Sequence, residues 1–173
     1  PDHWTTASSA GNVTYTQSDD AHTGKSAIQL TLASDNKRLG YQETILKAGT
    51  YTFTFWAKSA DGNVTSTRGG YVGVDDSNTA NSNGYKYGAY VNDIQSEWVK
   101  VEYTFTLEAD TRVSLLVMMP KKSNYTTASL IVDDASLTTE NGGIIEGGST
   151  GEEPEYQKMT VAEAQAAAAN TPV

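Results

Sequence analysis

The sequence contains no cysteine, only 2 histidines and no long apolar run. Without cysteine the chain has no disulfide, no thiol nucleophile and no Cys-based zinc or iron–sulfur site. Two histidines are too few for an imidazole-rich metal centre. No apolar segment approaches the roughly 20 residues that a membrane-spanning helix requires, so direct membrane insertion is not expected.

Basic residues are also scarce. The chain has 12 Lys and Arg against 21 Asp and Glu, a formal charge of −9, and the basic residues are scattered along the sequence. Such a chain repels nucleic acid, which is therefore not an expected partner. No opposed carboxylate pair, nucleophile elbow or phosphate loop is recognisable, and the sequence predicts that the protein is not an enzyme. The first residue is not Met, and we expect the numbering to begin inside a longer or processed chain.

The clearest pattern that is present runs through residues 49–58. Aromatic and threonine side chains alternate there with period two, which predicts a strand with one buried and one solvent-facing side. Trp56 falls on the solvent-facing side among threonines and a lysine. Residues 98–107 alternate in the same way, with Val, Tyr, Phe and Leu on the inward side.

About nine short strands follow one another, separated by polar turns, and one of them is a weaker strand over residues 39–45. This spacing predicts an all-β fold, an antiparallel β-sandwich of the jelly-roll type, over residues 1–139. Residues 140–157 are rich in Gly and Glu and predict a flexible acidic linker. Residues 158–173 predict a short helix, since Thr160 and Glu163 form a capping box before an Ala-rich stretch. We expect this helix to open a truncated second domain.

Several segments together resemble a known family. They are residues 22–30, 49–58, 98–101 and 130–137, with Trp4 before them. They are similar to the β-sandwich carbohydrate-binding modules and galactose-binding-like domains of bacterial surface proteins and glycoside hydrolases, and residues 160–173 are similar to a small barrel domain that follows such modules in Bacteroidota surface lipoproteins. The resemblance implies a non-catalytic glycan-binding module of a multidomain protein that is secreted or lies on the outer cell surface of a bacterium. Its expected partners are an oligo- or polysaccharide and neighbouring domains of the same chain. The alternative is a structural spacer or protein-interaction module without a sugar ligand.

Exposed aromatic rings are the candidate sugar-binding groups, because they match the flat C–H faces of sugars. Tyrosines beside small polar residues also suit recognition surfaces. In an extended segment Tyr85 and Tyr87 share one side and Tyr90 lies on the other. The residues predicted to bind the ligand are Trp56, Lys58, Tyr71, Tyr85, Tyr87 and Tyr90. The alternative for Trp56 is that a neighbouring loop covers its ring, and the alternative for the tyrosines is ordinary strand packing.

Asp133 and Asp134 interrupt an otherwise apolar strand. Strand alternation directs one of the two carboxylates inward, where an unpaired charge is costly. A salt bridge to one of the arginines would offset this cost, and so would calcium, which prefers carboxylate and carbonyl oxygens. The family resemblance implies a structural calcium held by Asp133 together with the backbone of Thr23 and Lys25.

Overall fold

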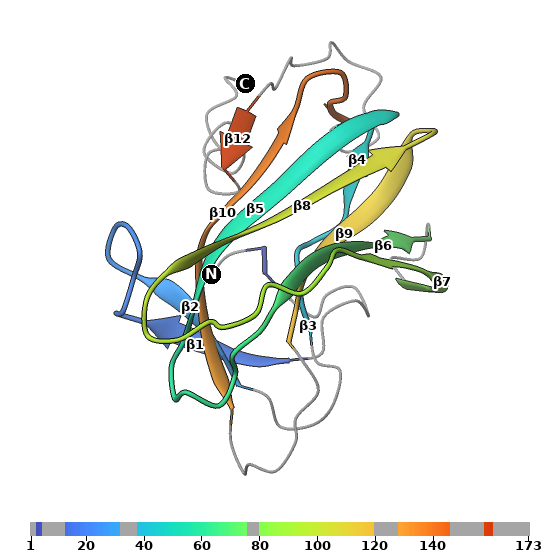
Figure 1. The fold of residues 1–173 in the computed structure, drawn as a ribbon. Coiled ribbons are helices and arrows are strands. Elements are labelled where there is room, and N and C mark those ends of the chain that lie inside the picture. The colour runs from blue at the N-terminus through green and yellow to red at the C-terminus, as the bar shows by residue number, and fades with distance from the viewer. Residues whose placement is uncertain are drawn as a thin grey trace.

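The structure is a computed structural model that describes residues 3–4, 13–31, 38–75, 80–119, 128–145 and 158–160. Within these residues every regular element is a strand, and the strands form two antiparallel sheets that pack face to face (Figure 1). No helix long and apolar enough to cross a membrane occurs in this part of the chain. The prediction of an all-β antiparallel sandwich is confirmed.

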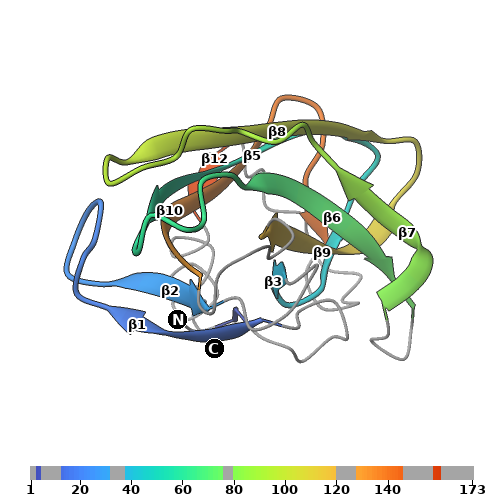
Figure 2. The ribbon, with the colours of Figure 1, turned by 60° about the horizontal axis from the view of Figure 1, so that its bottom comes forward.

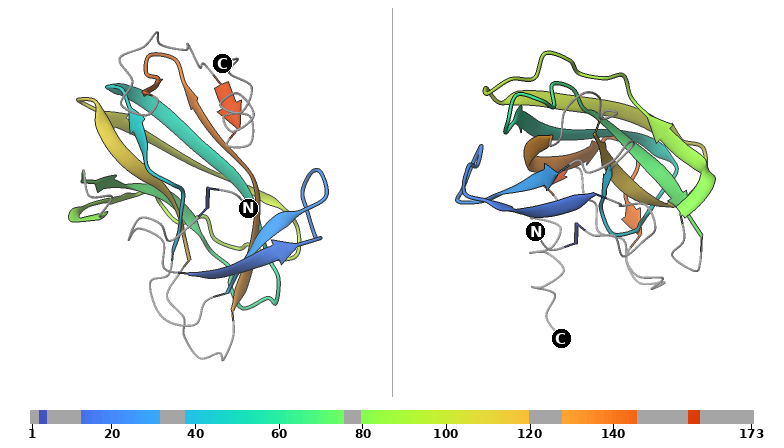
Figure 3. Two further views of the ribbon diagram at one scale, coloured as in Figure 1. Left: turned by 180° about the vertical axis from the view of Figure 1, so that it is seen from behind. Right: turned by 90° about the horizontal axis from the view of Figure 1, so that it is seen from below.

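The first sheet is built around two long strands, β5 and β10, which pair along most of their length. Its strand order is β1-β2-β10-β5-β8, and β12 pairs with the distal half of β10. The strands are β1 (Thr14–Ser18), β2 (Ala27–Thr31), β5 (Gly49–Ser59), β8 (Val99–Leu107), β10 (Ser129–Thr139) and β12 (Lys158–Thr160). Figure 3 shows the β1–β2 hairpin projecting at the edge of this sheet.

The second sheet is centred on β9, which pairs with β6 on one side and with β3 and β4 on the other. Its strand order is β11-β4-β9-β6-β7, with β3 beside β9. The strands are β3 (Arg38–Gly40), β4 (Thr44–Leu46), β6 (Arg68–Val74), β7 (Ala80–Tyr87), β9 (Thr111–Met118) and β11 (Ile144–Ile145). β6 and β7 lie side by side in Figure 2.

The two inner faces form one hydrophobic core. In β5, the predicted inward residues Tyr51, Phe53 and Phe55 are each at most 1% exposed, so the alternation seen in the sequence is confirmed. Rings from both sheets meet there: Tyr71 of β6 lies 4.7 Å from Phe105 of β8, centroid to centroid. Burial of this aromatic surface is the main favourable contribution to folding.

Two regions differ from the predicted organisation. The weak strand expected over residues 39–45 is split into β3 and β4. Residues 140–145, which were predicted to begin the linker, are part of the sandwich, because β11 pairs with β4 and Gly143 donates its N–H to the buried Tyr51 hydroxyl at 2.9 Å. The sandwich thus extends to residue 145 instead of ending at 139.

The predicted helix also differs at its start. Residues 158–160 form the strand β12 on β10 instead of the first turn of a helix. The remainder of the predicted helix, 161–173, and linker residues 146–157 lie outside the described residues.

Core tyrosines make the protein sensitive to alkali. Burial raises the pKa of Tyr103 to about 12, from 10.0 in its ordinary environment. The unfolded tyrosine ionises from pH 10 upward while the folded one stays neutral, so stability is complete below pH 10 and falls as the pH rises toward 12. We expect Tyr103→Phe to reduce this loss, which urea unfolding of both proteins at neutral and at alkaline pH would measure. An equal loss in both proteins would contradict the assignment to Tyr103.

Candidate functional site

The outer face of the second sheet carries an unusual set of side chains for a solvent-facing surface. Along β9, Val113, Leu115 and Val117 belong to the main core, so Leu116 and Met118 lie on the opposite, outer side. The register places Met118 directly between Arg38 of β3 and Arg68 of β6. Both arginines therefore lie on the outer face.

Three tyrosines gather with these arginines. Tyr85 and Tyr87 lie on β7, opposite Val72 and Gly70 of β6, and Tyr90 follows the end of the strand. The Arg38 guanidinium lies 4.3 Å from the ring centroid of Tyr85 and donates a hydrogen bond of 2.8 Å to its hydroxyl. The Arg68 guanidinium lies 4.3 Å from the ring centroids of both Tyr87 and Tyr90. We call Arg38, Arg68, Tyr85, Tyr87 and Tyr90 the tyrosine–arginine face.

This face rests on an apolar floor. Val72, Val74 and Leu116 form a small buried cluster, separate from the main core, against which Tyr85 and Tyr87 pack. Val72 and Leu116 are fully buried although they lie on the outer side of the sheet. Arg38 and Tyr85 come from strands separated by β9 and β6, so their side chains lean toward each other across these two strands. The five side chains themselves are only half-buried and so remain accessible from solvent.

The polar groups of the face are held in defined states. Burial raises the pKa of Tyr87, so its phenol stays protonated and able to donate a hydrogen bond at physiological pH. The Nε atom of Arg68 is buried and has no hydrogen-bond partner. Cation–π contact with two rings stabilises the guanidinium by about 0.5–2 kcal/mol per contact and fixes its plane.

The outer face of the first sheet carries Trp56, as predicted, and its ring is half-buried with another ring stacked on it. His22, from the turn between β1 and β2, stacks on Trp56 with the ring centroids 4.1 Å apart and the planes at 15°. Trp98 meets His22 edge-on at 5.5 Å. Lys58 forms an ion pair with Asp20 and lies 5.4 Å from the Trp98 ring centroid. The covered ring agrees with the alternative of a neighbouring loop that roofs Trp56.

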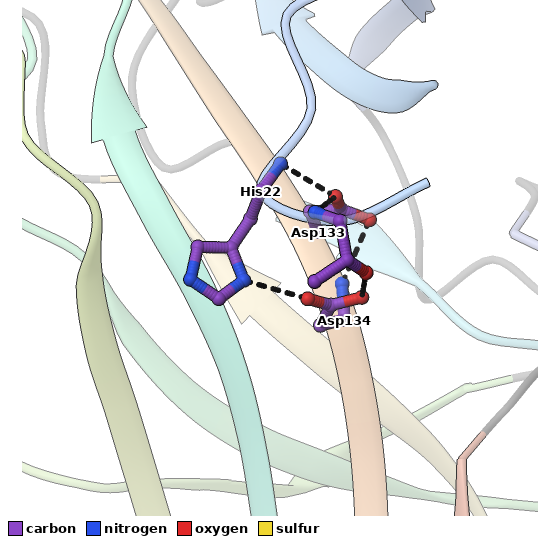
Figure 4. A network of polar contacts seen from close by, with 4 residues as sticks. His22, Asp133 and Asp134 are labelled. Atoms are coloured by element: carbon purple, nitrogen blue, oxygen red, sulfur yellow. Dashed lines mark hydrogen bonds and ion pairs between the residues drawn. The ribbon is translucent and has the colours of Figure 1, made fainter. Parts of the chain in front are cut away.

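Asp133 and Asp134 hold this turn in place (Figure 4). Asp133 accepts hydrogen bonds from the backbone N–H groups of His22, at 2.9 Å, and Thr23, at 3.2 Å, on one oxygen. Its other oxygen accepts the N–H of Asp134 at 2.8 Å. Asp134 contacts Nδ1 of His22 at 2.7 Å and accepts the Thr23 hydroxyl at 2.6 Å. A β-bulge and a positive φ of 48° at Asp134 turn both carboxylates toward the hairpin.

The expected calcium site stays a prediction. Calcium is bound by oxygen atoms, and in this structure one oxygen of Asp133 accepts the N–H groups of His22 and Thr23. Lys25 is exposed in the turn. Within the described ranges no group of three or more His, Cys, Asp or Glu is arranged to hold a metal ion. The charge of Asp133 is satisfied by hydrogen bonds, and neither a salt bridge to an arginine nor a cation is required.

The predicted ligand residues fall in three places. Trp56 and Lys58 lie on the outer face of the first sheet, beside the carboxylates. Tyr85, Tyr87 and Tyr90 lie on the outer face of the second sheet, where Tyr90 joins the two others although alternation predicted it on the opposite side. Tyr71 points into the core against Phe105.

Sequence reasoning overlooked His22, Trp98, Arg38 and Arg68 as members of these clusters. The contacts of His22 with Trp56 and of Arg38 with Tyr85 join residues far apart in the chain, and no local pattern predicts them. One signal was present for the arginines, because the chain has only three and two of them are followed by a glycine within two residues.

Comparisons with known proteins agree with this architecture. A family model described as "Carbohydrate binding domain" matches residues 1–126. This is a non-catalytic domain type, in agreement with the prediction that the chain is not an enzyme. No curated protein matches the sequence.

Three solved structures with similar folds are all carbohydrate-binding modules. A "Family 16 Carbohydrate Binding Module-2" has a TM-score of 0.52 and 16% identity, over 79% of this chain and 91% of that chain. The CBM22-1 xylan-binding domain of Paenibacillus barcinonensis has a TM-score of 0.52 and 16% identity, over 73% and 81%. TmCBM61 in complex with β-1,4-galactotriose has a TM-score of 0.50 and 16% identity, over 81% and 99%. At this identity the likeness shows the fold alone.

Proposed function

This chain belongs to the carbohydrate binding domain family, whose model matches residues 1–126, and from this membership we propose that it binds a glycan. We place the binding site on the tyrosine–arginine face of the second sheet. The observation that carries this proposal is the gathering of Tyr85, Tyr87 and Tyr90, all half-buried, with the first two packed on an apolar floor. Tyrosine rings offer apolar surface to the C–H groups of a sugar, and phenol and guanidinium groups hydrogen-bond its hydroxyls. The fold holds these groups on rigid strands and so lowers the entropic cost of binding.

The opposite face of the molecule is a weaker candidate. His22 stacks on Trp56 and Asp20 pairs with Lys58, whereas the groups that contact the three tyrosine rings are guanidinium groups, which can hydrogen-bond a sugar themselves. We therefore propose the tyrosine–arginine face, and not Trp56, as the ligand site.

The test is glycan binding by two variants with opposite expectations. Tyr87→Ala removes a ring that packs on the apolar floor and contacts the Arg68 guanidinium. We expect the affinity for any bound oligosaccharide to fall at least about tenfold. Trp56→Ala, the matched change on the first sheet, is expected to leave that affinity within about twofold of wild type. A glycan array followed by calorimetry on the best oligosaccharide measures both, with circular dichroism to confirm the fold.

The reverse pattern, in which Trp56→Ala abolishes binding and Tyr87→Ala does not, would move the site to the first sheet. Absence of binding across neutral and acidic glycans would leave the structural spacer as the function. The spacer receives some support from the covered Trp56, since that ring then needs no ligand.

We further propose that the module works outside the cell, as part of a multidomain bacterial protein that degrades or captures polysaccharide. The names of the similar structures support this setting, because one is a xylan-binding domain and another was solved with a galactan oligosaccharide. In such a protein the module would hold neighbouring domains at the polysaccharide.

A further inference from the structure

All three arginines of this acidic chain lie on one face. The chain carries a formal charge of −9, and its only arginines are Arg38, Arg68 and Arg112. Arg38 and Arg68 flank Met118 in the register, and Arg112 lies on the same side of β9 as Leu116 and Met118 because the strand alternates. The basic residues are scattered in the sequence, but the fold gathers every guanidinium on the outer face of the second sheet.

The strands that carry this face lack negative charge. None of the six strands of the second sheet contains Asp or Glu, although the whole chain has 21 such residues. The nearest carboxylates along the chain are those of Glu43, Asp75, Asp110 and Glu146, each one residue outside the end of a strand. The first sheet differs, since its outer face includes Glu102 of β8 and Asp133 of β10. The two outer faces thus differ in charge.

Arg68 is the arginine best placed to meet a ligand. Its guanidinium is held by two tyrosine rings, and among the described residues it pairs with no carboxylate. Its Nε atom lacks any hydrogen-bond partner. A partly desolvated guanidinium of fixed orientation is a strong site for a carboxylate, which it binds through charge-assisted hydrogen bonds.

We propose that the tyrosine–arginine face selects acidic glycans, whose sugar rings carry carboxylates such as those of uronic acids, over neutral glycans of the same backbone. This inference rests on the proposed function above and names the class of ligand for that site. Tyr85, Tyr87 and Tyr90 contact the sugar rings, and Arg68 binds the carboxylate.

The negative charge of the whole protein does not prevent this selection. At physiological ionic strength the Debye length is about 8 Å, so carboxylates on the first sheet are largely screened from a ligand on the second. A ligand bound on the tyrosine–arginine face lies within one Debye length of the guanidinium groups there, so their attraction for its carboxylates is not screened. Binding of an acidic glycan should therefore depend on Arg68 and weaken with salt, whereas binding of a neutral one should not.

The experiment compares two probes that share a backbone and differ in charge: short oligogalacturonides, and the same oligomers with every carboxylate methyl-esterified. Glucuronic-acid-substituted and unsubstituted xylo-oligosaccharides form a second pair. Calorimetry on the wild-type chain is expected to show at least about tenfold tighter binding of the acidic member of at least one pair. Raising NaCl from about 0.05 M to about 0.5 M should weaken binding of the acidic probe and leave that of the neutral probe unchanged.

Arg68→Gln is expected to lower the acidic-to-neutral affinity ratio about tenfold or more. The ratio is the relevant quantity, because loss of the two cation–π contacts can weaken both probes together. Arg68→Lys keeps the charge but not the planar fork, and should give an intermediate ratio. Lys100→Gln removes the same charge from an exposed position of β8, on the other sheet, and should leave the ratio unchanged.

The results separate the two proposals. Binding of neutral probes equal to or tighter than that of acidic probes overturns the acidic selection and leaves glycan binding intact. An unchanged ratio in Arg68→Gln also overturns it. No binding of either member of both pairs overturns the acidic selection, while a glycan array then decides whether the chain binds sugars at all.

Discussion

Replacing Gly142 by alanine is expected to lower the free energy of unfolding by about 3 kcal/mol or more. A Cβ atom at this position would overlap the ring and hydroxyl of Tyr51 and come within 2.9 Å of Thr139 Oγ1. Tyr51 is 1% exposed, and its hydroxyl donates to the Lys47 carbonyl at 2.7 Å, so the ring cannot move aside. Gly49 approaches from the other side, where its own Cβ would lie 2.7 Å from the Gly142 Cα.

Gly143→Ala is the matched control. Its Cβ would meet only Lys47 Cδ, at an ordinary 3.6 Å, and we expect a change within about 0.5 kcal/mol. Guanidinium unfolding measures both variants, and hydrogen exchange at Lys47 and Gly143 distinguishes global loss of stability from release of β11 alone. Equal stability of the two variants would show that residues 140–145 do not pack on Tyr51 as described.

This corner of the sandwich also shows how far the sequence predicts the fold. The alternation of residues 49–58 predicted which side chains of β5 are buried, because a strand with one wet face is encoded locally. The packing of residues 140–145 was not predictable in the same way. Their Gly-rich composition resembles a linker, and only the long-range contact with Tyr51 makes them part of the sheet.

The candidate site, like the fold, depends partly on local sequence patterns and partly on contacts between segments far apart in the chain. Alternation alone placed Tyr85 and Tyr87 on one side of a strand and Trp56 on the solvent side of another. Whether a ring stays accessible depends on neighbours from distant segments: His22 covers Trp56, and β6 directs Tyr71 into the core. The charge of each face was not predictable from the sequence either, because the scattered arginines become neighbours only when β3 and β6 pair with β9.

Replacing Asp133 by alanine is expected to lower the free energy of unfolding by about 2–3 kcal/mol and to expose Trp56. The substitution leaves three backbone N–H groups, those of His22, Thr23 and Asp134, without their acceptor. His22 would then lose its anchored position over Trp56, because the turn is held to β10 mainly through this carboxylate and that of Asp134. Urea unfolding measures the stability, and a red shift with stronger acrylamide quenching of tryptophan fluorescence reports the uncovered ring.

Asp19→Ala is the appropriate control, since it removes the same charge from an exposed position of the same hairpin and should change stability by less than about 0.5 kcal/mol.

Hydrogen bonding of Asp133 to backbone N–H groups and binding of calcium by Asp133 predict different effects of calcium on the melting temperature. If three N–H groups satisfy this carboxylate, chelation of calcium with EDTA leaves the melting temperature of the wild type unchanged and added calcium does not raise it. A calcium-dependent rise that disappears in Asp133→Ala would instead establish the metal site, and would require Thr23 and Lys25 to turn their carbonyl groups toward Asp133.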